Sequence, residues 1–418
     1  MTEHVTTRKK YADFSAVSMT EKNPKFVEAT SRTDKLYETD FESRASFVRD
    51  EHRLLNCTAY RRMKNKTQVF FATDNDHICT RIEHVTHVAA IAEIIAKGLK
   101  LNYDLVNAIA IGHDLGHAPF GHHGEHILND LVQRLGICVR FWHEGNSLNF
   151  VDNLELLPDY NGNMQNLNLT YAVRDGIVCH CGEVNEKCLK PRDEFFNLTD
   201  IQYASHVMPF TYEGCVVKLS DTIAYLGRDI EDAIIYNILS DKQLNEIKQI
   251  IYSAFPNDKL HQISPKLISY HFVEDLCQNS NPEEGLKFTD KTFEMMKLIK
   301  EYNTENICGH ARLQPFKKYA TLVLETIFEK IDTYFCDDIL RAIDEDSKLY
   351  PTLTTYFKKW LIRYTAIDLE EKAKNKWANK IVYDYKSQQF YRKAAVHFIS
   401  AMTDKFAIKI FNEIISFN

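Results

Sequence analysis

The stretch TRIEHVTHVAAIAEIIAKGLKLNYDLVNAIAIGHDLGHAPFGHHGE, residues 80–125, decides the fold. Its first part places apolar residues at the 3.6-residue spacing of an α-helix, which predicts a helix over 80–101. Asn102 interrupts this pattern, Asp104 is placed to cap the next helix, and a second helix is expected over 105–115. A connection this short makes the two helices antiparallel neighbours, so the stretch predicts a helix hairpin.

Pro119 interrupts the sequence after the hairpin. Because proline cannot continue a helix interior, residues 117–125 are expected to form a turn that leads into a helix over 125–135. The whole chain contains 14 Gly and 10 Pro in 418 residues, which favours long helices and argues against an all-β fold. Further helices are expected at 50–63, 168–180, 212–239, 243–254, 286–302, 313–334, 336–346, 350–361 and 390–415.

The predicted fold class is therefore all-α, with one mostly helical body. Residues 1–45 are polar and weakly periodic, and we expect them to form a partly ordered N-terminal arm. The rest of the chain shows no repeat, no low-complexity segment and no clear linker. Loops are expected at 158–167, 182–197, 256–265 and 277–284.

Composition and charge argue against several classes of protein. The net charge of −7 gives no electrostatic reason to expect nucleic-acid binding. No run of apolar residues approaches the ~18 that a membrane span requires, and Met1–Phe14 has no apolar core of a signal peptide. The ten cysteines contain no CxxC pair, and Cys179 and Cys181 are the closest two. This pattern predicts reduced thiols and a cytoplasmic protein.

Histidines are concentrated in one region, since nine of the 17 lie between His77 and His143. His84 is near the start of the first hairpin helix, and His113 and Asp114 are near the end of the second. Antiparallel packing then brings two imidazoles and a carboxylate to one point. Such ligands suit a divalent metal with open positions for water or phosphate. The alternative is an ordinary hairpin with buried histidines.

A fourth metal ligand is expected from a distant part of the chain, and Asp221 in the helix at 212–239 is the best candidate. Asp221, Tyr225 and Asp229 are four residues apart in turn and therefore share one helix face. Lys218 lies near the same line. The alternative is a solvated acidic face, and spacing alone does not separate the two interpretations.

The segment from His113 to Glu125, HDLGHAPFGHHGE, is the most specific one in the chain. Its glycines and proline hold several histidines and a glutamate directly after two of the expected metal ligands. Such a turn can place a proton donor beside a metal without making it a ligand. A second pair follows at His143 and Glu144, whereas His123 and His126 are expected to be surface or packing residues.

These strings, taken in order, resemble the HD phosphohydrolase superfamily. Within it they resemble the deoxynucleoside triphosphate triphosphohydrolases, also called dGTPase-like proteins. The resemblance covers residues 49–404. It rests on Arg49-Asp50, Ala59–Arg62, Lys66–Phe70, Thr80–His84, His113–His122, Phe141–His143, Ser220–Tyr225, Asp229–Ala233 and Phe398–Asp404.

The resemblance implies an HD-type catalytic core at 46–240 and a helical C-terminal region at 241–418 that packs on it. It implies hydrolysis of a deoxynucleoside triphosphate to the deoxynucleoside and intact triphosphate by a homo-oligomer. The implied cofactor is a divalent metal, Mg or Mn first, with Fe, Co and Zn also compatible. A nucleotide effector is a further implied partner, no membrane is involved, and nucleic-acid binding is left open.

The resemblance also assigns roles to individual residues. The leaving sugar oxygen is a poor leaving group and needs a general acid, for which His122 is the candidate. The expected metal ligands are His84, His113, Asp114 and Asp221. The expected proton-transfer residues are His122, Glu125, His143 and Glu144. The expected substrate contacts are Arg81, Lys218, Tyr225 and Asp229 for phosphate or sugar, and Gln68 for the sugar 3′ hydroxyl.

Five residues depart from those frequent in the family, namely Glu144, Asn146, Thr222, Phe398 and Ala401. None is an expected metal ligand, so the departures bear on substrate preference. Two other functions fit the same motifs. One is another HD reaction, on a nucleoside monophosphate or a cyclic nucleotide, and only the first function releases inorganic triphosphate. The other is a nucleotide-sensing regulatory protein, which turnover would distinguish.

Overall fold

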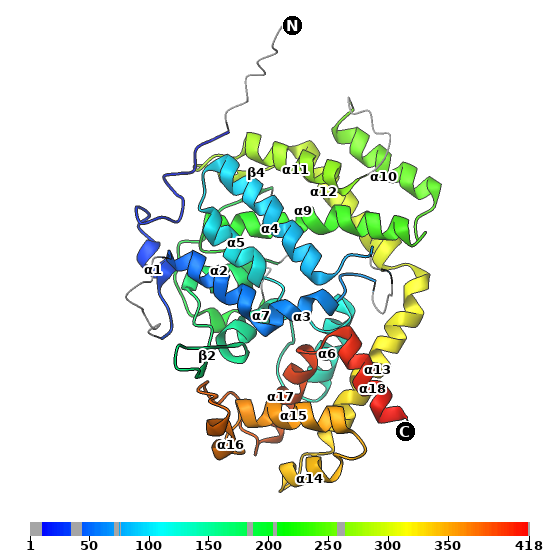
Figure 1. The fold of residues 1–418 in the computed structure, drawn as a ribbon. Coiled ribbons are helices and arrows are strands. Elements are labelled where there is room, and N and C mark those ends of the chain that lie inside the picture. Colours follow the sequence, from blue (N-terminus) through cyan, green and yellow to red (C-terminus); the bar gives the residue numbers. More distant parts are fainter. Residues whose placement is uncertain are drawn as a thin grey trace.

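The structure is a computed structural model that describes residues 11–34, 44–70, 75, 77–181, 187–203, 207–256 and 264–416 of the chain. Within these ranges the fold is all-α with a few short strands, as expected (Figure 1). The helices are α1 (Phe26–Thr30), α2 (Ser46–Asn56), α3 (Thr58–Arg62), α4 (Arg81–Leu99), α5 (Tyr103–Gly112), α6 (Gly121–Arg134), α7 (His143–Asn149), α8 (Tyr171–Cys179), α9 (Tyr212–Ile235), α10 (Asp241–Ala254), α11 (Pro265–Asn279), α12 (Asp290–Asn303), α13 (Gln314–Asp332), α14 (Ile339–Glu345), α15 (Pro351–Tyr364), α16 (Leu369–Lys374), α17 (Gln388–Ser400) and α18 (Asp404–Ile415).

Short strands and helical segments complete the described chain. Strand β1 (Leu156–Pro158) pairs with β2 (Met164–Asn166), and β3 (Cys188–Leu189) pairs with β4 (Leu286–Lys287), both antiparallel. The short 3₁₀ and π segments are Met63–Asn65, Phe150–Leu154, Leu198–Asp200, Thr304–Cys308 and Ala311–Leu313.

The predicted hairpin of α4 and α5 forms the centre of the molecule. It packs against the long helix α9, α2 packs on α5, and α8 contacts both α5 and α9. α4 begins with a capping box between Thr80 and Glu83. Asn102 caps the start of α5, and its side chain accepts hydrogen bonds from the backbone N–H groups of Asp104 and Leu105. The expectation that Asp104 caps this helix is wrong, because the residue that interrupts the first helix itself caps the second.

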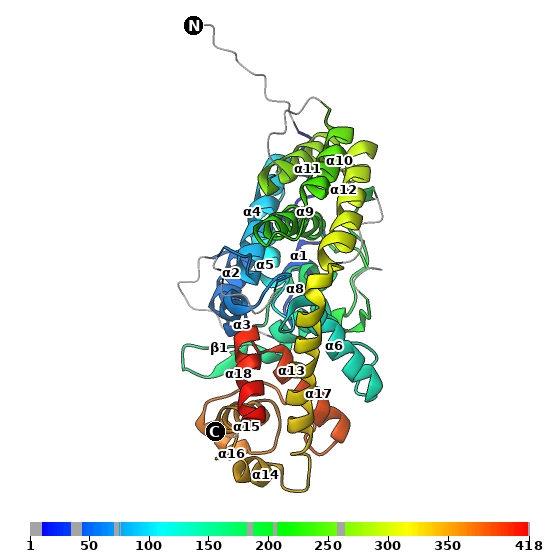
Figure 2. The same cartoon turned by 90° about the vertical axis from the view of Figure 1, so that its right-hand side faces the viewer.

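The remaining helices lie at the two ends of this centre. α10, α11 and α12 lie at one end, and α14 to α18 lie at the other, in both views (Figures 1 and 2). α13 contacts α6, α17 and α18, so it joins the distal helices to the helix that follows the histidine-rich turn.

Several helices differ from the expectation, and α1, α7 and α16 stand where no helix was expected. α6 begins at Gly121 rather than at residue 125, because Phe120 and Gly121 both have positive φ and turn the chain directly after Pro119. The helix expected at 390–415 is interrupted, since the Thr403 side chain accepts from the Phe406 N–H and starts α18 as a new helix. α11 was not expected and extends into the loop predicted at 277–284.

Part of the expected N-terminal arm packs on the core. Phe14 is fully buried and its backbone N–H donates to the Leu99 carbonyl at 2.9 Å. The buried carboxylate of Glu213 accepts from the Met19 N–H at 2.8 Å. Residues 1–10 and 35–43 of the arm, and 182–186 and 257–263 of two expected loops, lie outside the described residues.

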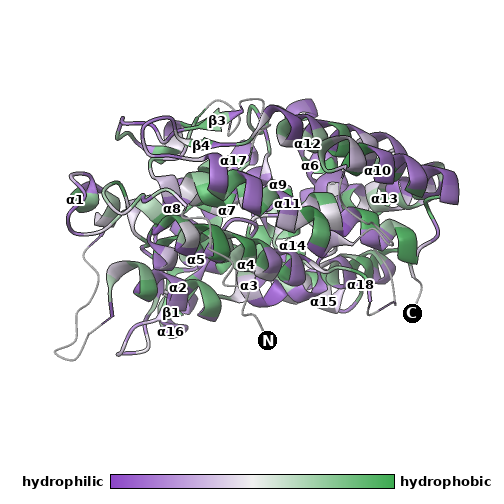
Figure 3. Cartoon of the chain, turned by 90° about the horizontal axis from the view of Figure 1, so that it is seen from above, coloured by the Kyte–Doolittle hydropathy of each residue, from purple (hydrophilic) through white to green (hydrophobic). Residues whose placement is uncertain are grey.

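The helices carry both hydrophobic and hydrophilic segments, as Figure 3 shows from above. This is the pattern of helices that bury one face and expose the other. Among the described helices, none combines the length and apolar character that crossing a membrane requires.

Candidate metal centre and active site

Two helix ends and the middle of a third helix bring four acidic and histidine side chains together. His84 lies in the first turn of α4 and His113 directly follows α5, with their ring centroids 5.7 Å apart. Asp221 Oδ1, from α9, is 3.0 Å from His84 Nε2 and 4.0 Å from His113 Nε2. Asp114 Oδ2 is 3.4 Å from His113 Nε2 and 3.8 Å from His84 Nε2. All four side chains are buried, and they converge on one point.

The donor atoms of this group fit a divalent cation. His113 Nδ1 donates to the Ala110 carbonyl at 2.6 Å, so Nε2 is the ring nitrogen that faces the two carboxylates. This Nε2 atom has no hydrogen-bond partner among the described residues. One ligand atom each from His84, His113 and Asp221 lie within 4.8 Å of one another. Since imidazole and carboxylate together suit divalent metals, these residues could hold one.

Arg81 balances the buried charge of Asp114. Its Nη1 donates to Asp114 Oδ2 at 2.7 Å, and the Arg81 side chain is 1% exposed. Burial by itself would raise the pKa of Asp114, but the His113 imidazole and the Arg81 guanidinium hold it well below the usual value. The carboxylate is therefore deprotonated, as metal ligation requires.

A second group of side chains lies in the first turn of α6 and at the start of α7. His143 Nδ1 is 2.8 Å from Glu125 Oε2, and the His143 backbone N–H donates to Glu125 Oε1 at 3.1 Å. Glu144 Oε2 is 3.4 Å from His143 Nδ1. His122 Nδ1 is 3.5 Å from Glu125 Oε2, and the His122 side chain is 59% exposed. Glu125 therefore lies between a buried imidazole and an accessible one.

The Glu125–His143 pair is ionised. Burial alone would lower the pKa of His143, but the carboxylates of Glu144 and Glu125 raise it well above the usual value. Burial would raise the pKa of Glu125, but the His143 and His122 imidazoles hold it well below its ordinary range. A charge of each sign is thus buried beside the candidate metal ligands.

His117 connects the two groups. Its Nε2 is 3.3 Å from Asp114 Oδ1, and its ring stacks on His143 at a centroid distance of 3.9 Å. The His122 ring lies edge-on to it at 5.0 Å. The sequence places His117 in the turn but assigns it no role, because its contact with Asp114 depends on how the turn folds.

His180 is a residue that sequence reasoning missed. It directly follows α8, its ring centroid is 4.8 Å from that of His113, and its Nε2 is 3.9 Å from Asp114 Oδ1. Burial lowers its pKa to about 3, so the imidazole is neutral and able to ligate a metal. The only signal near it in the sequence is its place between Cys179 and Cys181, the closest cysteines in the chain.

The expected substrate residues of α9 are buried or half-buried, which contradicts a solvated acidic face. Tyr225 is half-buried, and burial raises its pKa. Asp229 is 6% exposed, and burial, together with the neighbouring Asp232, raises its pKa to about 8. Lys218 donates to the carbonyl oxygens of Cys179 and Cys181, so in this structure it holds the segment that carries His180.

Gln68 lies beside the histidine-rich turn. The side chain is buried, and its Oε1 has no hydrogen-bond partner among the described residues. Gly121 has φ of 61°, and a Cβ at this position would lie 2.8 Å from the Gln68 carbonyl oxygen. A side chain at 121 is therefore excluded both by conformation and by space.

The C-terminal motif fixes the same region from the other side. Asp404 Oδ2 accepts from the Thr67 hydroxyl at 2.7 Å, and its Oδ1 accepts from the Phe120 N–H at 3.0 Å. Lys66 Nζ donates to the Ser400 carbonyl at 2.9 Å and to the His117 carbonyl. Segments from three distant parts of the chain thus define the position of the turn.

Helix α7 anchors the start of the turn. Ser147 Oγ donates to the His113 carbonyl at 2.7 Å and accepts from the Gly116 N–H at 2.9 Å. The Asn146 amide donates to the Gly116 carbonyl at 2.6 Å. Asn146 departs from the residue frequent in the family, yet it still holds the backbone between the metal ligands and Pro119.

Comparison with known proteins agrees with this arrangement. The HD domain family matches residues 81–226. A deoxyguanosinetriphosphate triphosphohydrolase-like protein of Desulfatibacillum aliphaticivorans is 34% identical over 73% of this chain and 80% of its own. One of Caldanaerobacter subterraneus is 33% identical over 71% of this chain and 74% of its own. One of Rickettsia bellii is 29% identical over 90% of this chain and 93% of its own.

Proposed function

Because this chain belongs to the HD-domain family of deoxyguanosinetriphosphate triphosphohydrolase-like proteins, we propose that this hydrolase acts on deoxynucleoside triphosphates and releases the deoxynucleoside and inorganic triphosphate. One observation carries the proposal. A buried group of metal-ligand type lies next to an ionised Glu125–His143 pair with the accessible His122 at its edge. Phosphate ester hydrolysis needs both a site for the phosphate charge and a proton donor for the leaving oxygen.

In this proposal His84, His113, Asp114 and Asp221 hold the metal. When bound, the metal offsets phosphate charge and activates water, and Mg or Mn is our first choice. Asp114 and Asp221 supply charge because their pKa values are held low by imidazoles and, for Asp114, by Arg81. The neutral His180 lies close enough to Asp114 to be a further ligand.

His122 is the proposed general acid toward the sugar 5′ oxygen. Its ring is the most exposed of the group and is 5.5 Å from the His143 ring, so it can face a substrate that enters from solvent. Glu125 holds His122 and His143 together and is a positioning residue. Glu144 adds to the charge that keeps His143 protonated.

The remaining residues contact the substrate. Arg81 donates to Asp114 and to the Thr67 carbonyl, and its Nε, which has no hydrogen-bond partner among the described residues, is the proposed donor to the phosphates. Tyr225 and Asp229 follow Asp221 on α9 by one and two helical turns and contact the triphosphate or sugar. Gln68 reads the sugar 3′ hydroxyl. Lys218 acts here by holding the segment of His180, in place of a direct phosphate contact.

The proposal includes the larger organisation. The catalytic core comprises residues 46–240, and the C-terminal region at 241–418 packs on it and contributes Ser400 and Asp404 to the position of the turn. The protein acts in the cytoplasm as a homo-oligomer that can respond to a nucleotide effector.

A panel of all deoxynucleoside and ribonucleoside triphosphates with Mg or Mn tests the function, with products resolved by chromatography. We expect equal amounts of deoxynucleoside and inorganic triphosphate. Release of monophosphate and pyrophosphate, or turnover of nucleoside monophosphates or cyclic nucleotides instead, would assign another HD reaction. Binding of nucleotides without turnover in either metal would assign a sensor.

A further inference from the structure

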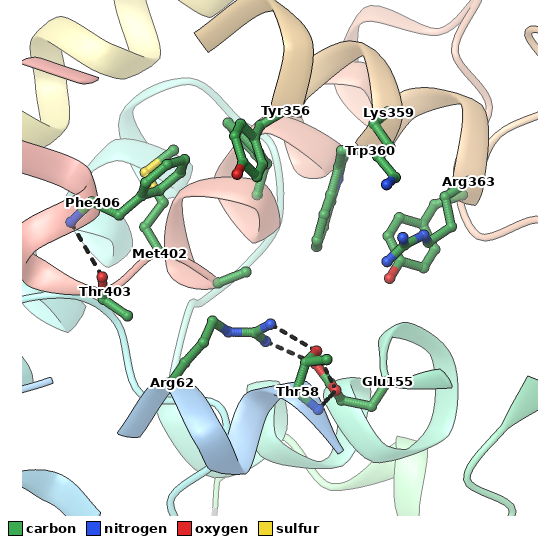
Figure 4. A pocket seen from close by; sticks show the side chains of 13 residues that line it. Thr58, Arg62, Glu155, Tyr356, Lys359, Trp360, Arg363, Met402, Thr403 and Phe406 are labelled. Atoms are coloured by element: carbon green, nitrogen blue, oxygen red, sulfur yellow. Dashed lines mark hydrogen bonds and ion pairs between the residues drawn. The ribbon is translucent and has the colours of Figure 1, made fainter. Parts of the chain in front are cut away.

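A second cavity lies away from the candidate active site. It has a volume of about 430 Å³ and opens between α3, α15 and the junction of α17 and α18 (Figure 4). None of the expected metal, proton-transfer or substrate residues lines it. We call it the α15 cavity. Its size is within the range of sites for small organic ligands.

One side of the α15 cavity is aromatic. Tyr356 and Trp360 extend from consecutive turns of α15 into the opening, and Phe406 of α18 lies beside Tyr356 (Figure 4). The Tyr356 ring is 5.0 Å from Phe406, and the Trp360 ring is 5.6 Å from Phe398. Tyr356 remains 54% exposed. Rings arranged along one edge of a cavity offer a stacking surface to a flat aromatic ligand.

The other side of the cavity is positively charged. Lys359 and Arg363 project from α15, and neither forms a salt bridge with a carboxylate among the described residues (Figure 4). Lys359 Nζ lies 5.9 Å and the guanidinium carbon of Arg363 lies 4.7 Å from the centre of the Trp377 ring. Arg62 pairs with Glu155 at 2.8 Å across the floor. Three cations against one carboxylate, in a chain of net charge −7, favour an anionic ligand.

Three polar groups in this lining are buried without a partner. They are Arg62 Nε, Trp360 Nε1 and Arg363 Nε, and none has a hydrogen-bond partner among the described residues. All three are donors. These atoms have almost no exposed surface, so a ligand reaches them only if the side chains move; they add unused hydrogen-bonding capacity to the wall of the cavity.

We propose that the α15 cavity is a second binding site, for a planar aromatic anion of the size of a nucleoside monophosphate. The ring stacks on the face of Trp360, and the anionic group binds Lys359 and Arg363. The site does not depend on the reaction catalysed elsewhere in the chain.

The position of the cavity connects its ligand to the active site. Met402 and Thr403 line it, and they lie between Ser400 and Asp404. The Ser400 carbonyl accepts from Lys66, which also donates to the His117 carbonyl, and Asp404 accepts from the Phe120 N–H within the histidine-rich turn. A ligand in the cavity therefore contacts the segment that holds that turn.

Direct binding to the full-length protein tests the proposal. Probes are AMP and GMP, with adenosine as a neutral aromatic control, ribose 5-phosphate as an anion without a ring, and 2-naphthoate as an aromatic carboxylate. Titration is followed by calorimetry and by tryptophan fluorescence in the presence of EDTA. We expect a dissociation constant on the order of 10–100 μM for at least one aromatic anion and far weaker binding of both single-feature controls. Comparison of the nucleotides with 2-naphthoate distinguishes a phosphate from a carboxylate ligand.

Four variants locate the site. Lys359→Ala and Arg363→Ala should each weaken binding by about tenfold, because each removes a charged donor. Lys358→Ala is the matched control, since Lys358 is the neighbouring residue and bonds Asp344 at 2.7 Å outside the cavity. Asp114→Asn should leave this binding unchanged. Hydrogen exchange should slow at residues 356–363 and 401–406 on binding.

Two outcomes overturn the proposal. One is that binding survives Lys359→Ala and Arg363→Ala but is lost in Asp114→Asn, which would place the probe in the active site. The other is that no aromatic anion binds at millimolar concentration. A second copy of the chain that covers the cavity would give this same result and would also overturn the proposal.

Discussion

Asp229→Asn should make the protein more stable, and more so at high pH. Asp229 is buried on α9, and its Oδ1 has no hydrogen-bond partner among the described residues. Burial and Asp232 raise its pKa from the ordinary 3.8 to about 8. Between these two values the folded state retains a proton that the unfolded state has lost. The free energy of unfolding therefore falls as pH rises from about 4 to about 8.

The magnitude follows from the difference between the two pKa values. At ~1.4 kcal/mol for each pKa unit, the full effect at pH 8 has an upper limit of about 6 kcal/mol. Asparagine removes the titration but leaves a buried amide and loses the attraction to Arg81, so part of the gain is cancelled. We expect the gain in unfolding free energy at pH 8 to exceed the gain at pH 5 by about 2–4 kcal/mol.

Urea unfolding of wild type and variant at pH 5 and pH 8, with EDTA present, measures this difference. Glu231→Gln is the matched control, because Glu231 is on the same helix but is half-buried and pairs with Arg228. For Glu231→Gln, the change in unfolding free energy relative to wild type should be equal at pH 5 and pH 8 within error. The reasoning is refuted if Asp229→Asn is no more stable than wild type at pH 8, or if its gain is the same at both pH values. The variant should also bind substrate more weakly, since stability and function conflict at this position.

Three further predictions concern the proposed active site. Asp114→Asn keeps an acceptor for Arg81 but removes a charged ligand. Metal content by elemental analysis and turnover should therefore both fall to background, while the circular dichroism spectrum is unchanged. Full metal occupancy of the variant would contradict the ligand assignment. Gln68→Ala should narrow the preference for deoxynucleotides over ribonucleotides, measured as the ratio of kcat/KM values, and an unchanged ratio in a folded variant would count against this role. His122→Ala should lower kcat by ~10²–10⁴-fold while metal and substrate still bind. His123 Nε2 contacts the Lys317 carbonyl at 2.9 Å, so the kcat of His123→Ala should remain near that of wild type. The reverse result would exclude His122 as the acid.

Rules of sequence periodicity and helix capping were sufficient for structure that depends on residues close together in the chain. The 3.6-residue spacing predicted α4, and a break at Asn102 predicted the hairpin, because side-chain periodicity and capping act over a few residues. The same rules failed at residue boundaries. Pro119 predicted a turn but not that α6 begins at Gly121, since the two positive φ values there depend on contacts with Gln68 and Asp404.

The sequence by itself determined the helical class, the hairpin, and the order of ligand-type residues His84, His113, Asp114 and Asp221, because these follow from spacing and residue chemistry along the chain. Only the tertiary structure decided which other side chains join them. His180 enters the group because α8 packs on α5 and α9, and Asp404 holds the turn from across the fold. Contacts between residues hundreds of positions apart depend on how whole helices pack, and no local pattern encodes that packing.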